Sequence, residues 1–260
     1  MQEFSDLGIK LKGQHSQQKV QCPNCIKLGK ENYKDTCLSV NVADGLYNCH
    51  KCGWQGKGKK ENNYTMSSNV YKMPQKQNMK ALTTEGKQFL LDRGITEDVI
   101  KANKIVATKN NNNIIFPYFK DGEMVNYKTR GIDGKFFTQS KDAEPIVYNY
   151  DRCKNSETII CEGEMDSLSW EVAGITYHTS VNMGAPNIGD KNIDKKLECI
   201  NTCYDIFDEA KRIYIATDED DNGRNLQKEL VRRFGAEKCL LVDLSPHKDA
   251  NEVLLTEGVE

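Results

Sequence analysis

Short apolar runs alternate with amphipathic segments through the C-terminal part of the chain. The apolar runs predict strands at residues 158–161, 175–179, 212–217 and 239–243. The segments between them predict helices at 164–173, 192–209, 222–234 and 249–255. Because strands that alternate with helices usually pair in parallel, we expect an α/β fold with a mainly parallel sheet.

The middle of the chain shows a different pattern, in which alternating runs are separated by hairpin-type turns. The runs Asn113–Phe119, Glu123–Arg130 and Lys135–Gln139 flank the dipeptides Asp121-Gly122 and Asp133-Gly134. A pair of helices is predicted before this meander, with apolar positions at 89–91 and 99–100 and with Thr96 placed to cap the second helix.

The N-terminal part has short alternating runs that predict a small β-rich module. Residues 57–80 are polar with little periodicity, which is typical of a linker. We therefore expect a module over residues 1–56, a flexible linker over 57–80, a mixed α+β basic subdomain over 81–156 and an α/β subdomain over 157–260.

Charge is unevenly distributed along the 260 residues, although the net charge is only −2. Residues 1–60 contain ten Lys/Arg against five Asp/Glu, whereas residues 151–260 contain thirteen against twenty-three. A basic front and an acidic end suit a protein that holds a polyanion and metal ions, but acidic surfaces are also common on soluble proteins. No apolar run approaches the roughly 18 residues of a membrane span, and MQEFSDLGIK lacks a signal-peptide layout, so we expect a cytoplasmic protein and no membrane partner.

Four of the ten cysteines form two CxxC pairs, Cys22/Cys25 and Cys49/Cys52, with 23 residues between the pairs (26–48). Two such pairs predict a tetrahedral, structural Zn²⁺ site in preference to a redox pair. We expect Cys37 to be a strand residue and His50 a surface residue. Trp54 could either cover the metal site or stack on a nucleic-acid base.

Two of the apolar runs end abruptly in acids. Residues 158–161 are followed by Glu162, Glu164 and Asp166, and residues 213–217 are followed by the acidic stretch 218–221. Parallel sheets bind ligands at the carboxyl ends of their strands, and crowded carboxylates need a cation such as Mg²⁺ or Mn²⁺ to stay ionised. A divalent-metal site for phosphate chemistry is therefore predicted. We expect three neighbouring acids to be solvated: Glu164, Glu219 and Asp221.

Basic residues on the predicted hairpin strands are candidates for binding phosphates. Lys128 and Arg130 are two positions apart and share a face, and Lys135 could join them across the turn. Such a row would hold triphosphates or a nucleic-acid backbone, or else protect an edge strand by its charge. Arg93 is a further candidate of the same kind.

Three segments together resemble a known family. Glu162-Gly163 with Asp166, the Asp218-x-Asp220 sequence running into Gly223-Arg224, and the segment 248–252 (KDANE) resemble the Toprim domain of primases, topoisomerases and some nucleases. A zinc ribbon, a linker, a basic strand region and a Toprim domain follow in the order of DNA primases. The chain is most similar to the primase half of phage primase–helicases.

The resemblance implies a DNA primase that makes short RNA primers on single-stranded DNA from ribonucleoside triphosphates. Its zinc ribbon would recognise the template, a replicative helicase would be fused or recruited, and a phage-encoded protein would act in the host cytoplasm. The implied catalytic acids are Glu162, Asp166, Asp218, Asp220 and Asp249, with all but Asp166 as Mg²⁺ or Mn²⁺ ligands and with Glu162 alternatively a general base. The implied nucleotide-binding residues are Lys128 and Arg130. A recombination mediator and a Toprim nuclease are the alternative functions.

Overall fold

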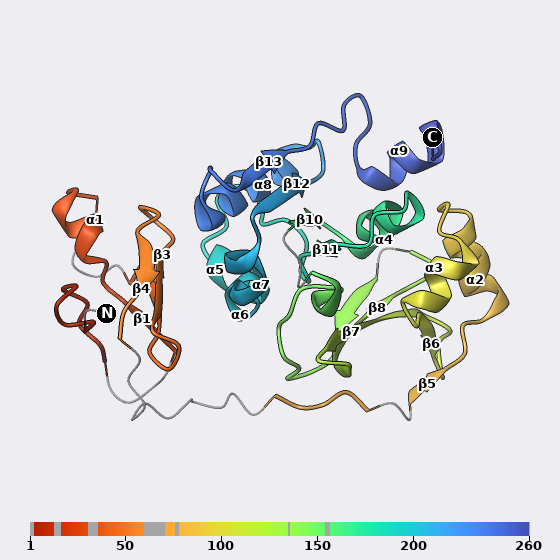
Figure 1. The fold of residues 1–260 in the computed structure, drawn as a ribbon. Coiled ribbons are helices and arrows are strands. Elements are labelled where there is room, and N and C mark those ends of the chain that lie inside the picture. The colour runs from red at the N-terminus through yellow and green to blue at the C-terminus, as the bar shows by residue number, and fades with distance from the viewer. Residues whose placement is uncertain are drawn as a thin grey trace. The chain divides into compact units, whose positions relative to one another are not determined.

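The computed structural model describes residues 3–12, 17–30, 36–59, 71–75, 78–134, 136–153 and 157–259. The chain divides into two compact units (Figure 1). The first comprises Met1–Val70 with Val231–Gly235, and the second comprises Tyr71–Leu230 with Ala236–Glu260.

The N-terminal unit is built on a four-stranded antiparallel sheet in the order β1-β2-β3-β4. Its elements are β1 (Gln17–Val20), α1 (Pro23–Lys27), β2 (Leu38–Asn41), β3 (Leu46–Cys49) and β4 (Gln55–Lys57). Strand β2 alternates as expected of a sheet with one buried face, since Leu38 and Val40 are fully buried. Trp54 packs on Tyr47 with ring centroids 4.6 Å apart, which covers part of its indole within the module. The predicted β-rich module is confirmed.

A five-stranded antiparallel sheet forms the middle of the second unit, in the order β5-β6-β7-β8-β9. The predicted Asp121-Gly122 hairpin is confirmed, because both residues have positive φ (53° and 80°), as a type I′ turn requires. In the next pair, Lys128 lies opposite Gln139 and Arg130 lies opposite Phe137. Lys135 lies outside the described residues. The strands are β5 (Met79–Lys80), β6 (Val106–Thr108), β7 (Ile114–Lys120), β8 (Glu123–Arg130) and β9 (Phe137–Gln139).

Two short helices precede this meander, α2 (Thr84–Leu91) and α3 (Glu97–Ala102), and a 3₁₀ turn, η2 (Tyr150–Arg152), follows it. The hydroxyl of Thr96 accepts a hydrogen bond from the Val99 amide (3.4 Å), so the predicted cap is confirmed.

The C-terminal part contains the predicted parallel sheet, in the order β11-β10-β12-β13. Strands β10 and β12 are neighbours, and Cys161 pairs with Ala216 at their carboxyl ends. Whatever follows these two residues is therefore brought to one edge of the sheet. The strands are β10 (Glu157–Cys161), β11 (His178–Ser180), β12 (Arg212–Ala216) and β13 (Cys239–Leu241).

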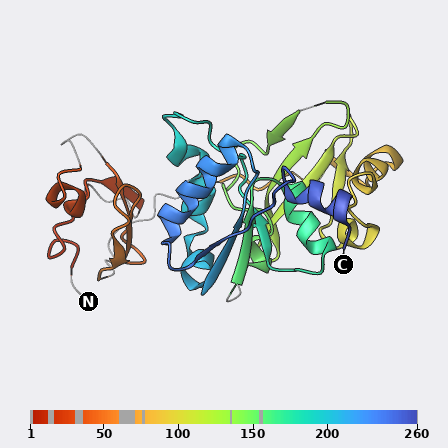
Figure 2. The same cartoon turned by 90° about the horizontal axis from the view of Figure 1, so that it is seen from above.

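Three longer helices accompany this sheet: α4 (Glu164–Val172), α8 (Asp221–Phe234) and α9 (Ala250–Glu257). Helix α4 contacts β10, β11 and α9 (Figures 1 and 2). Its C-terminal end is capped through Gly174 (φ +84°), two residues after Val172: the amides of Gly174 and Ile175 donate to the carbonyls of Glu171 and Trp170 (both 2.9 Å). Residues 175–177 connect the end of α4 to the sheet, so β11 begins three residues later than the strand predicted at 175–179.

The single helix predicted over 192–209 is wrong. The segment forms three short helices, α5 (Ile193–Lys196), α6 (Glu198–Thr202) and α7 (Tyr204–Glu209). The breaks fall at Leu197 and Cys203, where ψ is 26° and both side chains are fully buried. Burial of these side chains therefore outweighs the helical preference of the segment.

The predicted linker and domain limits stay predictions. Within residues 57–80 the structure describes 57–59, 71–75 and 78–80, of which Lys57 ends β4 and Met79–Lys80 form β5. Across the described ranges, no helix combines the length and apolarity needed to cross a membrane.

Candidate active site

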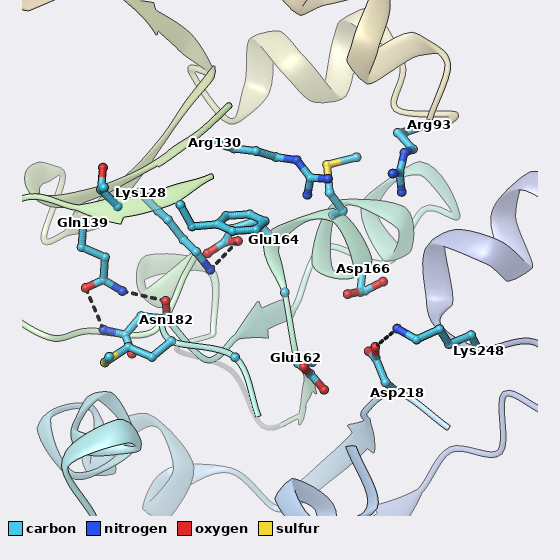
Figure 3. Close-up of a pocket in the computed structure, with 16 residues that line it drawn as sticks. Arg93, Lys128, Arg130, Gln139, Glu162, Glu164, Asp166, Asn182, Asp218 and Lys248 are labelled. Atoms are coloured by element: carbon cyan, nitrogen blue, oxygen red, sulfur yellow. Dashed lines mark hydrogen bonds and ion pairs between the residues drawn. The ribbon is translucent and has the colours of Figure 1, made fainter. Parts of the chain in front are cut away.

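A cavity of about 740 Å³ lies at the carboxyl ends of β10 and β12, with β8 and β9 contributing another wall. Figure 3 shows Glu162, Asp166 and Asp218 around it, with Arg93 and Arg130 approaching from another side. The charged side chains that line the cavity are Arg93, Lys128, Arg130, Glu162, Glu164, Asp166, Asp218 and Lys248. It thus brings together acids and bases that are more than 100 residues apart in the chain.

Glu162 follows β10, and Asp218 follows the neighbouring strand β12. The surroundings of both carboxyl groups disfavour the ionised form. Burial, followed by the charge of Asp218, raises the pKa of Glu162 to about 7. Burial likewise raises the pKa of Asp218, although its hydrogen bond to Lys248 opposes this. The Oε2 atom of Glu162 is buried and has no hydrogen-bond partner. Glu162 therefore offers an unsatisfied oxygen where negative charge accumulates.

Asp166 reaches the same place from the first turn of α4. Its Oδ1 accepts a hydrogen bond from the Asn251 amide (3.3 Å), which links α4 to the start of α9. Burial, together with the charges of Asp249 and Asp218, raises the pKa of Asp166 to about 8. The carboxyl groups at this edge therefore repel one another when ionised.

The segment after β12 turns sharply into α8. Asp220 accepts a hydrogen bond from the Gly223 amide (2.9 Å). A Cβ atom on residue 223 would lie 1.9 Å from the Asp218 carbonyl oxygen, so only glycine fits there. Asp221 is exposed and pairs with Arg224 (2.9 Å), as expected of a solvated acid, whereas Glu219 is partly buried and accepts a hydrogen bond from the Leu244 amide (3.2 Å).

Lys248 lies between three of the predicted metal ligands. Its Nζ is 2.5 Å from Asp218 Oδ2, 3.8 Å from Asp249 Oδ2 and 3.9 Å from Asp220 Oδ2. The Glu219 amide donates to the Lys248 carbonyl (2.7 Å), which fixes the lysine backbone beside the end of β12. The hydrogen bond to Asp218 raises the pKa of Lys248. The lysine thus serves as an internal counter-ion for these acids.

Glu164 is not solvated, and the expectation that it would be is wrong. It is 4% exposed, forms an ion pair with Lys128 (3.0 Å) and accepts a hydrogen bond from the Tyr118 hydroxyl. At the first position of α4 its side chain is directed toward β7 and β8, which tertiary packing determines and the local sequence does not show. Lys128 is consequently buried and neutralised within the protein.

We expect Lys128→Met to lower the free energy of unfolding by about 3–5 kcal/mol, because it leaves the Glu164 carboxylate buried without its cation. The double variant Lys128→Met/Glu164→Gln should recover much of this loss. Urea unfolding of the three proteins measures the effect. A loss below about 1 kcal/mol in the single variant would show that the pair is not needed for stability.

The two arginines differ from Lys128, since no carboxylate in the described ranges lies within ion-pairing distance of either one. Arg130 lies over the rings of Phe89 and Phe137 (both 5.1 Å from the guanidinium carbon to the ring centroid), and Arg93 lies over Phe89 (5.7 Å). Burial and the charge of Arg93 lower the pKa of Arg130, and its buried Nε has no partner. Two guanidinium groups without an acid partner are suited to binding an anion such as a phosphate.

Several residues of the site were missed by the sequence interpretation. Asn251 is almost fully buried and donates to the Arg93 carbonyl (2.8 Å) and to Ser169 (3.0 Å), so it holds α9 against α2 and α4. Asn251 and Lys248 both belong to the segment 248–252, whose resemblance to the Toprim domain could have marked them as site residues. At the cavity, Gln139 Nε2 donates to the Asn182 backbone carbonyl (2.6 Å), and Asn182 Nδ2 donates to Gln139 Oε1 (3.3 Å). No motif marks either residue.

The carboxylate edge fits a hydrated divalent cation. Among the described residues, only the four cysteines lie close enough together to ligate one ion directly. The carboxylates of the cavity lie farther apart than that. Mg²⁺ typically keeps several waters and uses one or two carboxylates together with substrate phosphates. The unsatisfied Glu162 oxygen and the raised pKa values of the acids match such a site.

In magnesium-free buffer, we expect the protein to become less stable as the pH rises from about 5 to 8. The pKa values of Glu162 (about 7) and Asp166 (about 8) lie above their ordinary values, so the folded chain binds these protons more tightly than the unfolded chain. Stability is therefore lost as the protons leave. Thermal unfolding across this range should show the decline, Asp166→Asn should flatten it, and a pH-independent wild type would contradict the shifts.

The four predicted zinc ligands come together in the N-terminal unit. The sulfurs of Cys22, Cys25, Cys49 and Cys52 all lie within 4.8 Å of one another. The Cys22–Cys52 and Cys25–Cys49 sulfur distances are both 3.6 Å, close to the edge of about 3.8 Å expected for tetrahedral Zn–S bonds. Amides of Cys25 and Lys51 point at Cys22 and Cys49 sulfurs (3.4 Å each). The cluster fits a structural zinc ion, and neither Cys37 nor His50 belongs to it.

A serine, a histidine and a glutamate are hydrogen-bonded in the order of a hydrolase catalytic triad, but they are closed to substrate. Ser167 Oγ is 2.7 Å from His178 Nδ1, and His178 Nε2 is 3.2 Å from Glu171 Oε2. Ser167 and His178 have no exposed surface, so no substrate can reach them. Burial lowers the pKa of His178, and the group is a structural polar network between α4 and β11.

Comparison with known proteins agrees with this geometry. Residues 159–254 match the Toprim-like domain family (Toprim_2). A primase homolog protein of Arabidopsis thaliana is 32% identical over 260 residues, which cover 91% of this chain and 77% of that protein. The chain belongs to the Toprim primase family. A Twinkle homolog protein, chloroplastic/mitochondrial, of the same plant is 31% identical over 270 residues; the match covers 95% of this primase-family chain but only 38% of the Twinkle homolog.

Solved primase structures share the fold. The primase fragment of the bacteriophage T7 primase–helicase superimposes with a TM-score of 0.56 at 21% identity, covering 93% of this chain and 95% of that one. The zinc-binding and RNA polymerase domains of the Aquifex aeolicus primase give 0.53 at 14% identity, covering 96% and 77%. The α/β fold class, with a β-rich cysteine module before a Toprim domain, is therefore confirmed.

Proposed function

We propose that this chain is a DNA primase that makes short RNA primers on single-stranded DNA from ribonucleoside triphosphates. The observation that supports this most directly is one cavity with a carboxylate edge and two guanidinium groups without acid partners. Such a cavity can hold a polyphosphate and a divalent cation together. Family membership supports the same reaction class, a nucleotidyl transfer.

Acids after β12 and at the start of α9 would hold Mg²⁺ or Mn²⁺, with Asp218, Asp220 and Asp249 as proposed ligands and Asp166 shaping their surroundings. When bound there, the cation would align the triphosphate, stabilise developing charge and lower the pKa of the attacking hydroxyl. Lys248 contacts Asp218 Oδ2, an oxygen that the cation would need. The lysine must therefore release Asp218, at least in part, when the cation binds.

The remaining side chains would bind and position the substrate. Arg93 and Arg130 would neutralise phosphates, and the buried Nε of Arg130 supplies a free donor. Lys128 would act mainly by keeping Glu164 and β8 in place. Glu162, with a pKa of about 7, could accept the proton of the attacking 3′-hydroxyl or serve as a further ligand.

The zinc module is proposed to recognise the template, as the basic charge of residues 1–60 would favour. A replicative helicase, either fused or recruited, is the proposed partner. One structural relative is named as a primase–helicase, and another is described as a DnaG catalytic domain bound to single-stranded DNA.

The test is incubation of the chain with single-stranded DNA of mixed sequence, labelled ribonucleotides and Mg²⁺ or Mn²⁺, followed by separation of the products by size. Short template-dependent oligoribonucleotides are expected. Degradation of the template would favour the nuclease alternative, and binding without synthesis or cleavage would favour the recombination mediator.

A further inference from the structure

A second set of side chains lines the cavity beside the charged groups. Phe137 lies opposite Arg130 in the β8–β9 register and diagonally from Lys128, so its ring shares their face of the sheet. The Lys128 ammonium is 5.5 Å and the Arg130 guanidinium 5.1 Å from the ring centroid. The aromatic ring is thus fixed next to Arg130, one of the two arginines proposed to hold phosphates.

The ring is fixed but not covered. Phe137 is 46% exposed even though it lines the cavity, and Met183, which also lines it, is 51% exposed. Two hydrogen bonds of Gln139, one to the Asn182 backbone carbonyl and one from the Asn182 side chain, tie the loop that contains Met183 to β9. Two apolar surfaces are therefore held at one end of a cavity whose other walls are charged.

An unused hydrogen-bond acceptor completes this end of the cavity. Asn182 is 3% exposed, and its Oδ1 has no hydrogen-bond partner. A buried acceptor without a partner is costly unless a ligand donates to it. A planar ligand with an N–H group would satisfy it while covering the apolar surfaces, and nucleobases have both features.

We propose that Phe137 is the stacking platform for a nucleobase, with Met183 beside it and Asn182 accepting a hydrogen bond from the base. This inference rests on the proposed function. It adds to it the part of the site that holds the nucleobase, whereas the arginines hold the phosphates. The base can belong to a nucleoside triphosphate or to the DNA template, because both offer the same aromatic face.

The test uses 2-aminopurine ribonucleoside triphosphate, whose fluorescence falls when the base stacks, bound to the full chain with Mg²⁺ and no template. We expect Phe137→Ala to remove the quenching and weaken binding by about 5- to 150-fold, the range for one lost base–aromatic stack. Phe137→Trp should restore both. Phe136→Ala is the matched control, because Phe136 is exposed to a similar degree (51%) but does not line the cavity.

Inorganic tripolyphosphate separates this inference from the proposed function. Phe137→Ala should bind it as well as wild type does. Unchanged affinity of Phe137→Ala for the fluorescent nucleotide, or equal weakening toward nucleotide and tripolyphosphate, would overturn the stacking role. If wild type bound neither compound, the proposed function would fail as well. Loss of quenching only for 2-aminopurine within single-stranded DNA would assign the platform to the template base.

Discussion

Replacing Asp218 with asparagine is expected to reduce primer synthesis by at least about 10²–10³-fold while the chain remains folded. Asp218 follows β12, is 9% exposed and contacts the cavity beside Glu162. The amide keeps the volume of the carboxylate and an oxygen that can accept from Lys248. It loses the negative charge that a divalent cation requires, so the effect should fall on catalysis.

Asp221→Asn is the matched control for this prediction. Asp221 lies in the same acidic segment, but its side chain is 79% exposed and pairs with Arg224. We expect its activity to stay within about twofold of wild type, as is usual for an exposed pair. Measuring product per unit time for both variants, with thermal unfolding to check the fold, decides the matter. Residual synthesis within tenfold of wild type for Asp218→Asn would remove this residue from the catalytic set.

The acidic edge could be predicted because its cause is local. An apolar run that ends in acids places carboxylates after a buried strand, and the parallel order of β10 and β12 then makes Glu162 and Asp218 neighbours. The same holds for the cysteine cluster, in which each CxxC pair brings two sulfurs together and the β2–β3 hairpin joins the pairs. Short-range patterns were sufficient in both cases.

The rest of the site depends on contacts between distant segments. Glu164 is buried because α4 packs near Tyr118 and Lys128, some 40 residues earlier in the chain. Phe137 faces the cavity because of the β8–β9 register, and Asn182 does so because of its bond to Gln139. A one-residue shift in that register would move Phe137 to the other face, and no local pattern excludes it.

Replacing Cys25 with serine is expected to remove zinc and unfold the N-terminal module, while the Toprim part keeps its structure. A module this small buries little core, so the metal supplies much of its folding free energy, on the order of 10 kcal/mol. Cys25 is fully buried, and burial raises the pKa of its thiol, so ionisation depends on the metal. Zinc content and hydrogen exchange report the two units separately: residues 17–57 should lose protection, and residues 78–230 and 236–259 should keep it.

Cys37→Ala provides the control, because Cys37 is also buried in the module but lies outside the four-sulfur cluster. It should retain zinc. If the module recognises the template, Cys25→Ser will fail to initiate on single-stranded DNA but will still extend a primer that is already annealed, since the acids of the cavity are untouched. Normal initiation by a zinc-free Cys25→Ser protein would refute template recognition by the module, and equal loss of extension would show that the zinc module also supports the catalytic unit.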